Sequence, residues 1–199
     1  MRLDPATVEA DPIDQFRLWY DGAVDAGVRQ PDAMTLATVD DSGNPSARTV
    51  LLRGFDARGL AFFTNRESDK AHDLAARPHA ALVLHWRELE RQVRIAGGVS
   101  VVDDNEADAY WVSRPLGHRI SAWASPQSRV IDAETLEARV AETELRFAGG
   151  EPPRPPFWGG YRVAVDEAEF WESRPDRLHD RVRYRRGPDG GWTRERLAP

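Results

Sequence analysis

The 199-residue sequence has no cysteine, which excludes disulfide bonds, thiolate metal ligands and catalysis by a thiol. It has no apolar run near the ~20 residues that a membrane-spanning helix requires, and no signal-peptide core follows Met1. Positive charge is in the minority, with a net charge of -6, whereas binding to nucleic acid through phosphates needs a basic surface. We therefore expect a cytoplasmic protein without a nucleic-acid or membrane partner.

Spacings typical of metal and dinucleotide sites are missing as well. The five histidines are scattered, so no metal site is predicted. The Gly-x-Gly-x-x-Gly fingerprint of dinucleotide-binding folds is absent, so a nucleotide cofactor must be held in another way. The arginine-rich residues 181–186 resemble an RNA-binding tract, but they also fit one basic strand of an acidic protein, and we favour the strand.

Hydrophobic periodicity predicts mostly strands. Period-two patterns cover residues 34–39, 46–55, 60–64, 80–86 and 92–102, with Gly97 and Gly98 marking a bulge or bend, and three or four strands follow residue 156. Helical patterns cover residues 12–27, 68–77, 103–112 and 132–147; residues 114–128 read as irregular, 149–156 as a stiff linker, and 1–10 carry no pattern that would fix them. Because strands and helices do not alternate, an antiparallel barrel is favoured over a doubly wound sheet.

Residues 169–181 combine an indole, an imidazole and three guanidinium groups around a turn that contains a proline. Arg177, His179 and Arg181 alternate, so an extended backbone would direct all three to one face beside Trp171. That mixture suits a planar, anionic ligand. On the pattern alone, the solvated face of an edge strand is an equal alternative.

Arg48 and Arg53 lie at the two ends of an apolar stretch. Five residues separate them, so an unbroken strand would direct them to opposite faces. Two separate anions, or one anion and one salt bridge, are the functional interpretations. Arginines that merely bound a buried strand are an alternative that the spacing does not exclude.

These segments, together with residues 157–162 and 196–199, resemble the pyridoxamine 5'-phosphate oxidase family. The resemblance implies a fold that is mainly β with flanking helices, the FMN-binding split β-barrel. It implies a single domain over residues 1–199, with residues 157–199 as the region of dimerisation and of the active site. It also implies a homodimer with flavin at the subunit interface, and oxidation of pyridoxamine or pyridoxine 5'-phosphate to pyridoxal 5'-phosphate by dioxygen, with hydrogen peroxide as the second product.

Carried over residue by residue, the resemblance also assigns roles. It implies FMN binding by Arg48, Thr49, Val50, Leu51, Phe63, Thr64, Lys70, Gln92, Gln127, Ser128, Trp171 and Arg181. It implies binding of the substrate phosphate by Arg53, Tyr110, Arg114 and His118. Arg177 and His179 match the catalytic pair that binds the substrate ring beside the flavin. Tyr110 and Arg114 are four residues apart, so a helix that persists would place them on one side.

Three positions depart from the family pattern. Asp69 stands where the family has arginine, Arg53 where it usually has lysine, and His118 where it has serine. The Arg-x-x-Tyr segment that covers the substrate in relatives has no counterpart in residues 1–16. These departures leave two alternatives open. One is a related flavin oxidase acting on another substrate, such as a phenazine precursor, and the other is a noncatalytic protein that binds flavin or a B6 phosphate.

Overall fold

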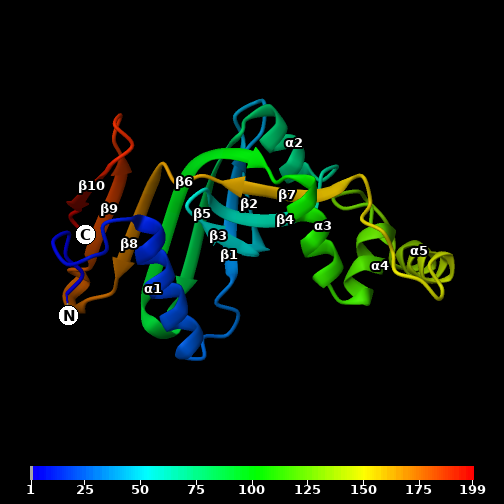
Figure 1. Cartoon of the computed structure of the whole chain (residues 1–199), viewed down its shortest axis with the longest axis horizontal. Coiled ribbons are helices and arrows are strands. Elements are labelled where there is room, and N and C mark those ends of the chain that lie inside the picture. The colour runs from blue at the N-terminus through cyan, green and yellow to red at the C-terminus, as the bar shows by residue number, and fades with distance from the viewer. Residues whose placement is uncertain (1) are drawn as a thin grey trace.

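The computed structural model describes residues 2–199, in which ten strands form one antiparallel sheet system. The strands are β1 (Ala33–Val39), β2 (Pro45–Leu51), β3 (Gly54–Asp56), β4 (Gly59–Asn65), β5 (His79–Trp86), β6 (Arg91–Val101), β7 (Trp158–Val163), β8 (Glu167–Glu172), β9 (Asp180–Arg186) and β10 (Trp192–Arg196). The main path runs β10-β9-β8-β6-β5-β1-β2, while β7 joins the far end of β6 and continues through β4 to β3 (Figure 1). This topology confirms the predicted antiparallel pairing of the strands.

Five helices and two short 3-10 turns connect these strands within the described residues. They are α1 (Pro12–Asp25), α2 (Asp69–Ala76), α3 (Asp104–Ser113), α4 (Leu116–Ala124), α5 (Ala133–Arg146), η1 (Arg87–Leu89) and η2 (Pro175–Arg177). Figure 1 shows α1 near the N-terminal end of the molecule, whereas α3, α4 and α5 gather at the opposite end. Among residues 2–199, no helix combines the length and the apolar character needed to cross a membrane.

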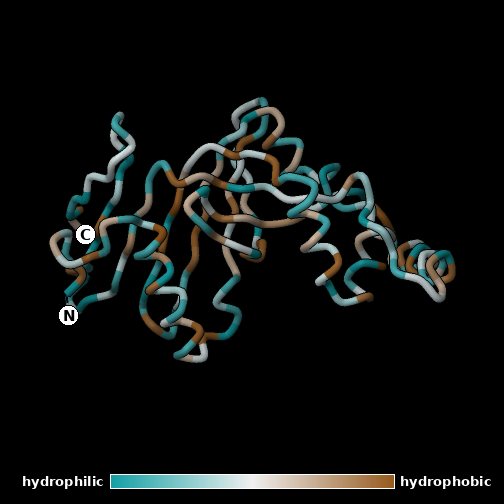
Figure 2. The backbone as a smooth tube through the Cα atoms, in the orientation of Figure 1, coloured by the Kyte–Doolittle hydropathy of each residue, from teal (hydrophilic) through white to brown (hydrophobic). Residues whose placement is uncertain are grey.

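Strand alternation sorts residues onto the two faces of the sheet. Val93, Phe170 and Val182 lie opposite one another on β6, β8 and β9, and all three are fully buried. Their neighbours along the strands therefore point the other way, because successive side chains alternate between faces. Figure 2 shows the contrast along the chain, with hydrophobic colours in the central strands and mostly hydrophilic colours along the hairpin of β9 and β10.

Helix α1 covers the core side of this sheet. The Asp11 carboxylate caps the helix by accepting a hydrogen bond from the Ile13 N–H at 2.7 Å, as a helix N-cap should. Trp19 packs edge-on against Phe170, with ring centroids 5.2 Å apart. Aromatic pairs of this geometry add to the stability from burial alone, so α1 is fixed to the strands that carry the C-terminal cluster.

The N-terminal segment is held in place, although its sequence shows no pattern. Leu3 and Val8 are buried in the core, and the Arg196 guanidinium donates to the Leu3 carbonyl oxygen at 2.9 Å. The Tyr184 hydroxyl donates to the Glu9 carbonyl oxygen at 2.7 Å. Contacts with strands distant in the sequence thus order residues 2–10, and a search for local periodicity cannot find such contacts.

Gly97 and Gly98 mark the point where β6 changes partners. The β6 register against β5 runs through them without an inserted residue, so the predicted bulge is absent on that side. Before Gly97, β6 pairs with β8, and beyond Gly98 it pairs with β7. A Cβ atom on Gly97 would overlap the Ala164 carbonyl oxygen. Glycine is therefore needed where the connection to β8 crosses close to β6.

Two expected boundaries were wrong. Residues 46–55 do not form one strand, because β2 ends at Leu51 and β3 begins at Gly54. Residues 114–128 are not irregular throughout, since they contain α4, which packs against α5. The start of α4 lacks a capping side chain, and Gly117 in its first turn is a poor helix former. Tertiary packing of the buried Ile120 and Ala124 overrides these local features.

Candidate functional site

A cavity of about 610 Å³ lies between β2, β4, the first turns of α2 and α4, and the C-terminal half of α3. It brings together thirteen of the residues that the sequence singled out, from segments up to 80 positions apart. They are Arg48, Thr49, Val50, Leu51, Arg53, Phe63, Thr64, Lys70, Tyr110, Arg114, His118, Gln127 and Ser128. The cavity therefore joins most of the predicted cofactor positions to all four predicted phosphate positions of the substrate.

Arg48 and Lys70 form one cationic end of the cavity. The Arg48 guanidinium donates to the Thr38 hydroxyl at 2.6 Å and lies 3.5 Å from the Asp73 carboxylate. Lys70 is the single lysine of the sequence, and it is only 7% exposed. Its ammonium lies 3.3 Å from the Thr64 hydroxyl, and no described carboxylate pairs with it. Burial, followed by the nearby charge of Arg48, lowers the pKa of Lys70.

Neutral donors and acceptors surround this cationic end. The Thr64 hydroxyl donates to the Gln127 side-chain oxygen at 3.1 Å, and the Asn65 N–H donates to the same oxygen at 3.3 Å. At the N-terminus of α2, the Asp69 N–H donates to the Ser128 hydroxyl at 3.2 Å. These bonds tie the loop after α4 to the end of β4, so Gln127 and Ser128 take fixed positions beside Lys70.

Asp69 belongs to the wall of the same cavity. It stands in the first turn of α2, where a carboxylate is favourable to the helix dipole. The same carboxylate adds negative charge beside Arg48 and Lys70. The departure from the family pattern is therefore located inside the site rather than on a remote surface.

A second cationic end contains Arg53, Arg114 and His118. The Arg114 guanidinium carbon lies 4.7 Å from the Trp158 ring centroid and 5.2 Å from that of Trp111, so indole faces hold it by cation–π contact. Its Nη1 atom is buried and has no hydrogen-bond partner among the described residues. Burial lowers the pKa of Arg114. An anion in the cavity would supply the partner that this nitrogen lacks.

Stacked aromatic rings form the wall between the two ends. The Phe63 ring lies 4.3 Å from the Tyr110 ring and 5.4 Å from the Trp158 ring, measured between centroids. Residue-by-residue assignment missed Trp158, although the Phe157-Trp158-Gly159-Gly160 segment had contributed to the resemblance. Gly160 is what lets β7 approach, since a Cβ atom there would collide with the Phe63 ring. Ser46 and Ala47 complete the missed set, and no spacing rule distinguishes them from other strand residues.

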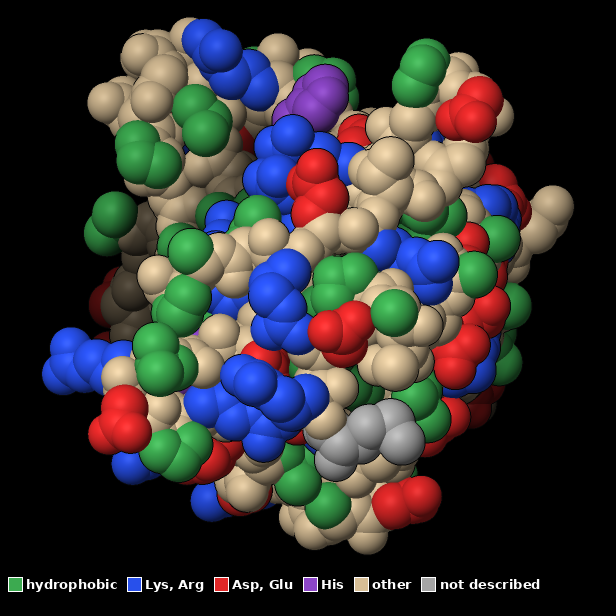
Figure 3. Space-filling view, turned by 90° about the vertical axis from the view of Figure 1, so that its left-hand side faces the viewer, with side chains coloured by type: hydrophobic (Ala, Val, Ile, Leu, Met, Phe, Trp, Pro, Cys, Tyr) green, Lys and Arg blue, Asp and Glu red, His purple; other side chains and the backbone are tan. Residues whose placement is uncertain are grey.

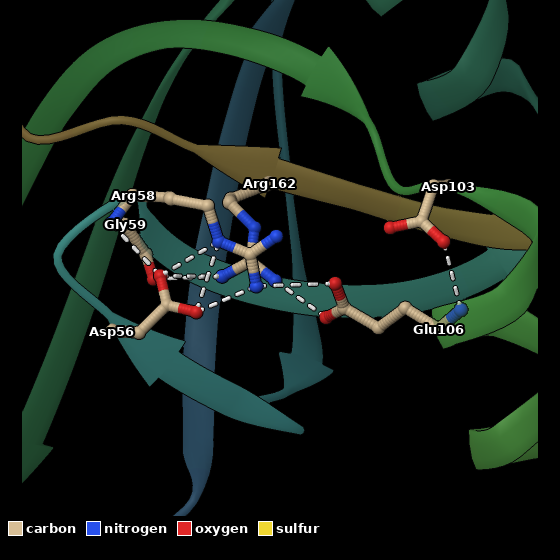
Figure 4. A network of polar contacts seen from close by, with 6 residues as sticks. All are labelled: Asp56, Arg58, Gly59, Asp103, Glu106 and Arg162. Atoms are coloured by element: carbon tan, nitrogen blue, oxygen red, sulfur yellow. Dashed lines mark hydrogen bonds and ion pairs between the residues drawn. The ribbon is translucent and has the colours of Figure 1, made fainter.

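An ion network around the buried Arg162 anchors helix α3, which carries Tyr110 (Figure 4). Arg162 on β7 is 6% exposed and contacts the Glu106 carboxylate at 2.5 Å and the Asp56 carboxylate at 3.3 Å. Figure 4 shows Arg162 between these two carboxylates, with Arg58 beside Asp56. Asp103 caps the helix by accepting from the Glu106 N–H at 3.0 Å. The network therefore fixes the helix one turn before Tyr110.

The remaining five predicted residues lie elsewhere. Gln92, Trp171 and Arg181 face one another across β6, β8 and β9, on the face opposite the buried row of Val93. His179 contacts Trp171, with ring centroids 4.6 Å apart. We call these residues and Arg177 the C-terminal cluster. It lies outside the lining of the cavity, so the residues that this sequence predicts for one site form two groups within the chain.

The expectation that Arg177, His179 and Arg181 share one extended face was wrong. Residues 175–177 form the turn η2, in which Asp176 and Arg177 have φ values of 57° and 59°. Only Arg181 lies in β9. The His179 Nδ1 atom accepts a hydrogen bond from the Arg174 N–H at 3.1 Å, and this bond closes the turn. Pro175 breaks the strand at this point.

Three of the four arginines of β9 are paired with carboxylates, and the fourth, Arg186, donates to the Val165 carbonyl oxygen at 3.2 Å. Arg181 donates to Glu169 at 2.7 Å and Arg183 to Glu195 at 2.6 Å, while Arg185 donates to Glu167 at 2.9 Å. Figure 3 views the end of the molecule that carries β9 and β10, and basic and acidic side chains lie beside one another over it. The interpretation of residues 181–186 as a strand is confirmed.

With its split antiparallel sheet and its cationic cavity, the chain has the fold of the FMN-binding split-barrel proteins. A solved FMN-binding protein from Nostoc punctiforme, described as related to pyridoxamine 5'-phosphate oxidase, has a TM-score of 0.71 at 22% identity, covering 90% of this chain and 97% of that one. At that identity, the likeness shows the fold. The fold expected from the sequence is thereby confirmed.

The chain belongs to the pyridoxamine 5'-phosphate oxidase family, whose members depend on FMN. The family described as pyridoxamine 5'-phosphate oxidase matches residues 20–147, and the C-terminal dimerisation region of pyridoxine 5'-phosphate oxidase matches residues 158–199. The pyridoxine/pyridoxamine 5'-phosphate oxidase 1 of Ralstonia nicotianae is 59% identical over 99% of this chain and 93% of its own length. The corresponding protein of Bordetella avium is 59% identical over 96% and 90%. A solved PhzG from Burkholderia lata, in complex with tetrahydrophenazine-1-carboxylic acid, is 34% identical with a TM-score of 0.94, covering 100% and 98%.

The cavity's donors fit an FMN phosphate. Lys70 is a buried cation whose partners are hydroxyl groups, and Arg48 adds a second cation. The N-terminus of α2 adds the positive end of a helix dipole. Asp69 opposes this set, and the Asp73 carboxylate lies 3.5 Å from Arg48, so the two cations have two carboxylates nearby.

Proposed function

We propose that this chain oxidises pyridoxine 5'-phosphate or pyridoxamine 5'-phosphate to pyridoxal 5'-phosphate. One observation carries the proposal: a single cavity contains two separate cationic ends, Arg48 with Lys70 and Arg53 with Arg114. A flavin phosphate and a substrate phosphate are two anions that must lie apart while the rings meet. The 59% identical relatives bear the name of this activity.

In the proposed reaction, the substrate alcohol loses two electrons and two protons, and dioxygen takes them up as hydrogen peroxide. The amine substrate also consumes water and releases ammonia. FMN, when bound, supplies the two-electron chemistry. The residues of the chain provide binding and orientation. No side chain has to act as a nucleophile.

The residues divide by the group that they hold. Arg48 and Lys70 hold the flavin phosphate, and Gln127 and Ser128 support it through neutral donors. The substrate phosphate is bound by Arg53, Tyr110, Arg114 and His118. One nitrogen of Arg114 is buried and has no hydrogen-bond partner among the described residues. A hydrogen bond from this nitrogen to the phosphate should therefore contribute more binding free energy than a bond from an exposed group would.

The C-terminal cluster completes the cavity of a second copy in a homodimer. Gln92, Trp171 and Arg181 contact the flavin, and Arg177 with His179 orients the substrate ring. Two facts support this arrangement: the cluster lies outside the cavity within one chain, and residues 158–199 match a dimerisation region. We also propose that residues 1–199 act as one domain, with residues 157–199 serving both the dimer and the site.

Mixing two inactive variants tests the shared site. Lys70→Ala damages only the cavity, and Arg177→Ala damages only the cluster. In a mixed dimer, one site carries both changes and the other carries neither. Random exchange of subunits should therefore restore about a quarter of wild-type activity, because half of the dimers are mixed and each has one intact site. If no activity returns after verified exchange, each chain builds its site alone.

The activity itself is tested by visible spectroscopy of the FMN-loaded protein. Anaerobic addition of pyridoxine 5'-phosphate should bleach the flavin band, and air should restore it with formation of hydrogen peroxide. Pyridoxine without the phosphate is the matched control and should bleach far more slowly. A band that stays unbleached with both vitamers would reject the proposed substrate while leaving the cofactor assignment intact.

A second candidate is a related oxidase that acts on a reduced phenazine precursor. The fold similarity to the Burkholderia lata PhzG favours it, as do Arg53 and His118 at the substrate end of the cavity. Such a substrate has a carboxylate in place of a phosphate ester. Equal bleaching by tetrahydrophenazine-1-carboxylic acid and by pyridoxine 5'-phosphate, or faster bleaching by the former, would favour this candidate. A noncatalytic binding protein would bind the vitamer without forming peroxide.

A further inference from the structure

Arg53, one of the cations of the substrate end, is itself ion-paired. Its Nη1 atom donates to the Asp32 carboxylate at 2.8 Å. The Arg53 side chain is 30% exposed and the Asp32 side chain 23%, so solvent only partly screens the pair. Within the described residues, no hydrogen bond from Nε or Nη2 of Arg53 is present, and Arg53 lines the cavity. One edge of the guanidinium is thus held while the other donors remain available.

Backbone contacts fix both members of the pair. The Leu52 N–H donates to the Asp32 carbonyl oxygen at 2.8 Å, and the Arg53 N–H donates to the Ala61 carbonyl oxygen at 2.8 Å. The buried Trp86 indole N–H donates to the Pro31 carbonyl oxygen at 3.0 Å, immediately before Asp32. The carboxylate is therefore attached to a rigid segment at the start of β1. Its direction does not depend on a mobile loop.

The geometry suits arginine in a way that it would not suit lysine. A guanidinium has five N–H donors in a fixed plane, so it can bind a carboxylate with one nitrogen and a phosphate with another. An ammonium is a single charged centre, and a carboxylate 2.8 Å away would compete with the ligand for it. The effect of Asp32 should therefore depend on which residue occupies position 53.

We propose that Asp32 is a positioning residue for the substrate phosphate: it orients Arg53, and it restricts position 53 to arginine. This inference rests on the proposed function, because it takes the anion at Arg53 to be the phosphate of a B6 vitamer. It assigns to Asp32 a role that depends on orientation rather than on net charge.

A double-mutant cycle tests the proposal. The four FMN-loaded proteins are the wild type, Asp32→Asn, Arg53→Lys and the double variant, and titration calorimetry measures the binding of pyridoxal 5'-phosphate. Asp32→Asn should weaken binding about fivefold when residue 53 is arginine, and strengthen it about fivefold when residue 53 is lysine. Steady-state kinetics should place the change in KM and leave kcat nearly constant. Pyridoxal, which lacks the phosphate, should respond to none of the substitutions.

Equal effects of Asp32→Asn in both backgrounds would overturn the proposal, because a carboxylate that acts only through its charge affects both cations in the same direction. A parallel change in pyridoxal binding would also overturn it, since the role would then be structural. If Asp32→Asn does not load FMN, Asp32→Ser provides a second neutral variant.

Failure of the proposed function gives a different result. In that case the wild type neither binds pyridoxal 5'-phosphate nor oxidises pyridoxine 5'-phosphate. The binding of inorganic phosphate to the four proteins is then measured instead. If the effect of Asp32→Asn on phosphate binding changes sign between the Arg53 and Lys backgrounds, the coupling of Asp32 to an anion at Arg53 is still supported. Additive effects of the two substitutions would reject it.

Discussion

Asp180, at the start of β9, is the buried charge beside the turn that carries Arg177 and His179. Its carboxylate is 1% exposed and accepts hydrogen bonds from Arg174 and Arg196, each at 2.8 Å. Burial by itself raises the pKa of Asp180, but these bonds and the charge of Arg2 outweigh it and lower the pKa from 3.8 to about 2. Replacing Asp180 by asparagine should therefore remove a favourable charge and leave three guanidinium groups facing one another.

The size of the effect follows from that pKa. The fall from 3.8 to about 2 corresponds to about 2 kcal/mol of folding free energy at neutral pH. A pKa lowered in the folded state stabilises the protein above the unfolded value of 3.8, and this contribution disappears as the pH falls through about 2. We expect Asp180→Asn to lower the free energy of unfolding by about 2 kcal/mol at neutral pH, with a difference that shrinks below pH 3.8.

Urea unfolding at a series of pH values, followed by tryptophan fluorescence at one fixed concentration of FMN, measures this difference. Asp176→Asn is the matched control, because Asp176 is exposed in the same turn and asparagine tolerates its positive φ. The control should change stability by less than about 0.5 kcal/mol. An Asp180→Asn difference that stays constant from neutral pH to the acid limit would refute the reasoning, since the carboxylate charge would then contribute nothing.

Three further predictions concern the cavity and the sheet. Asp69→Asn should tighten FMN binding about threefold, because it removes the one carboxylate that opposes the phosphate at the start of α2, and an unchanged Kd would count against this. As the single lysine, Lys70 should be the one lysine modified by an amine-selective reagent in FMN-free protein, and saturating FMN should protect it, as read by peptide mass analysis. Gly97→Ala should destabilise the fold by about 2 kcal/mol or more, because the new methyl group overlaps the Ala164 carbonyl oxygen. Gly98→Ala, with open space around the same atom, is its control, and equal losses of stability in urea would contradict the explanation.

Local patterns in the sequence predicted those helix starts that depend on contacts between residues close in the sequence. Asp11 with Pro12 predicted the start of α1, and Asp103 with Glu106 predicted the start of α3, because a capping side chain bonds to a backbone group within three residues. The same reasoning did not find α4, whose first turn lacks a capping side chain and contains Gly117. It could not place Leu3 in the core either, because the contacts that bury it come from the far end of the chain.

For the candidate site, too, the sequence predicted some features and the tertiary structure decided others. Spacing predicted that Tyr110 and Arg114 would share one side if the helix persisted; the helix ends at Ser113 and Arg114 is extended, yet both residues line the cavity. Spacing alone predicted that Arg48 and Arg53 would point to opposite faces of an unbroken strand. The strand ends at Leu51, before Arg53, and both side chains line the same cavity. The motifs that indicated the family identified all these residues, but they did not show which residues lie close together in the folded chain.

The sequence by itself therefore determined the antiparallel class of fold, the caps that begin α1 and α3, and the family to which the chain belongs. These properties depend on residue types at short, fixed spacings. Only the tertiary structure decided that Arg53 is held by Asp32, that Arg114 lies against Trp158, and that the C-terminal cluster is separate from the cavity. Such contacts join positions tens of residues apart, and their geometry depends on how the strands pair and where each strand ends.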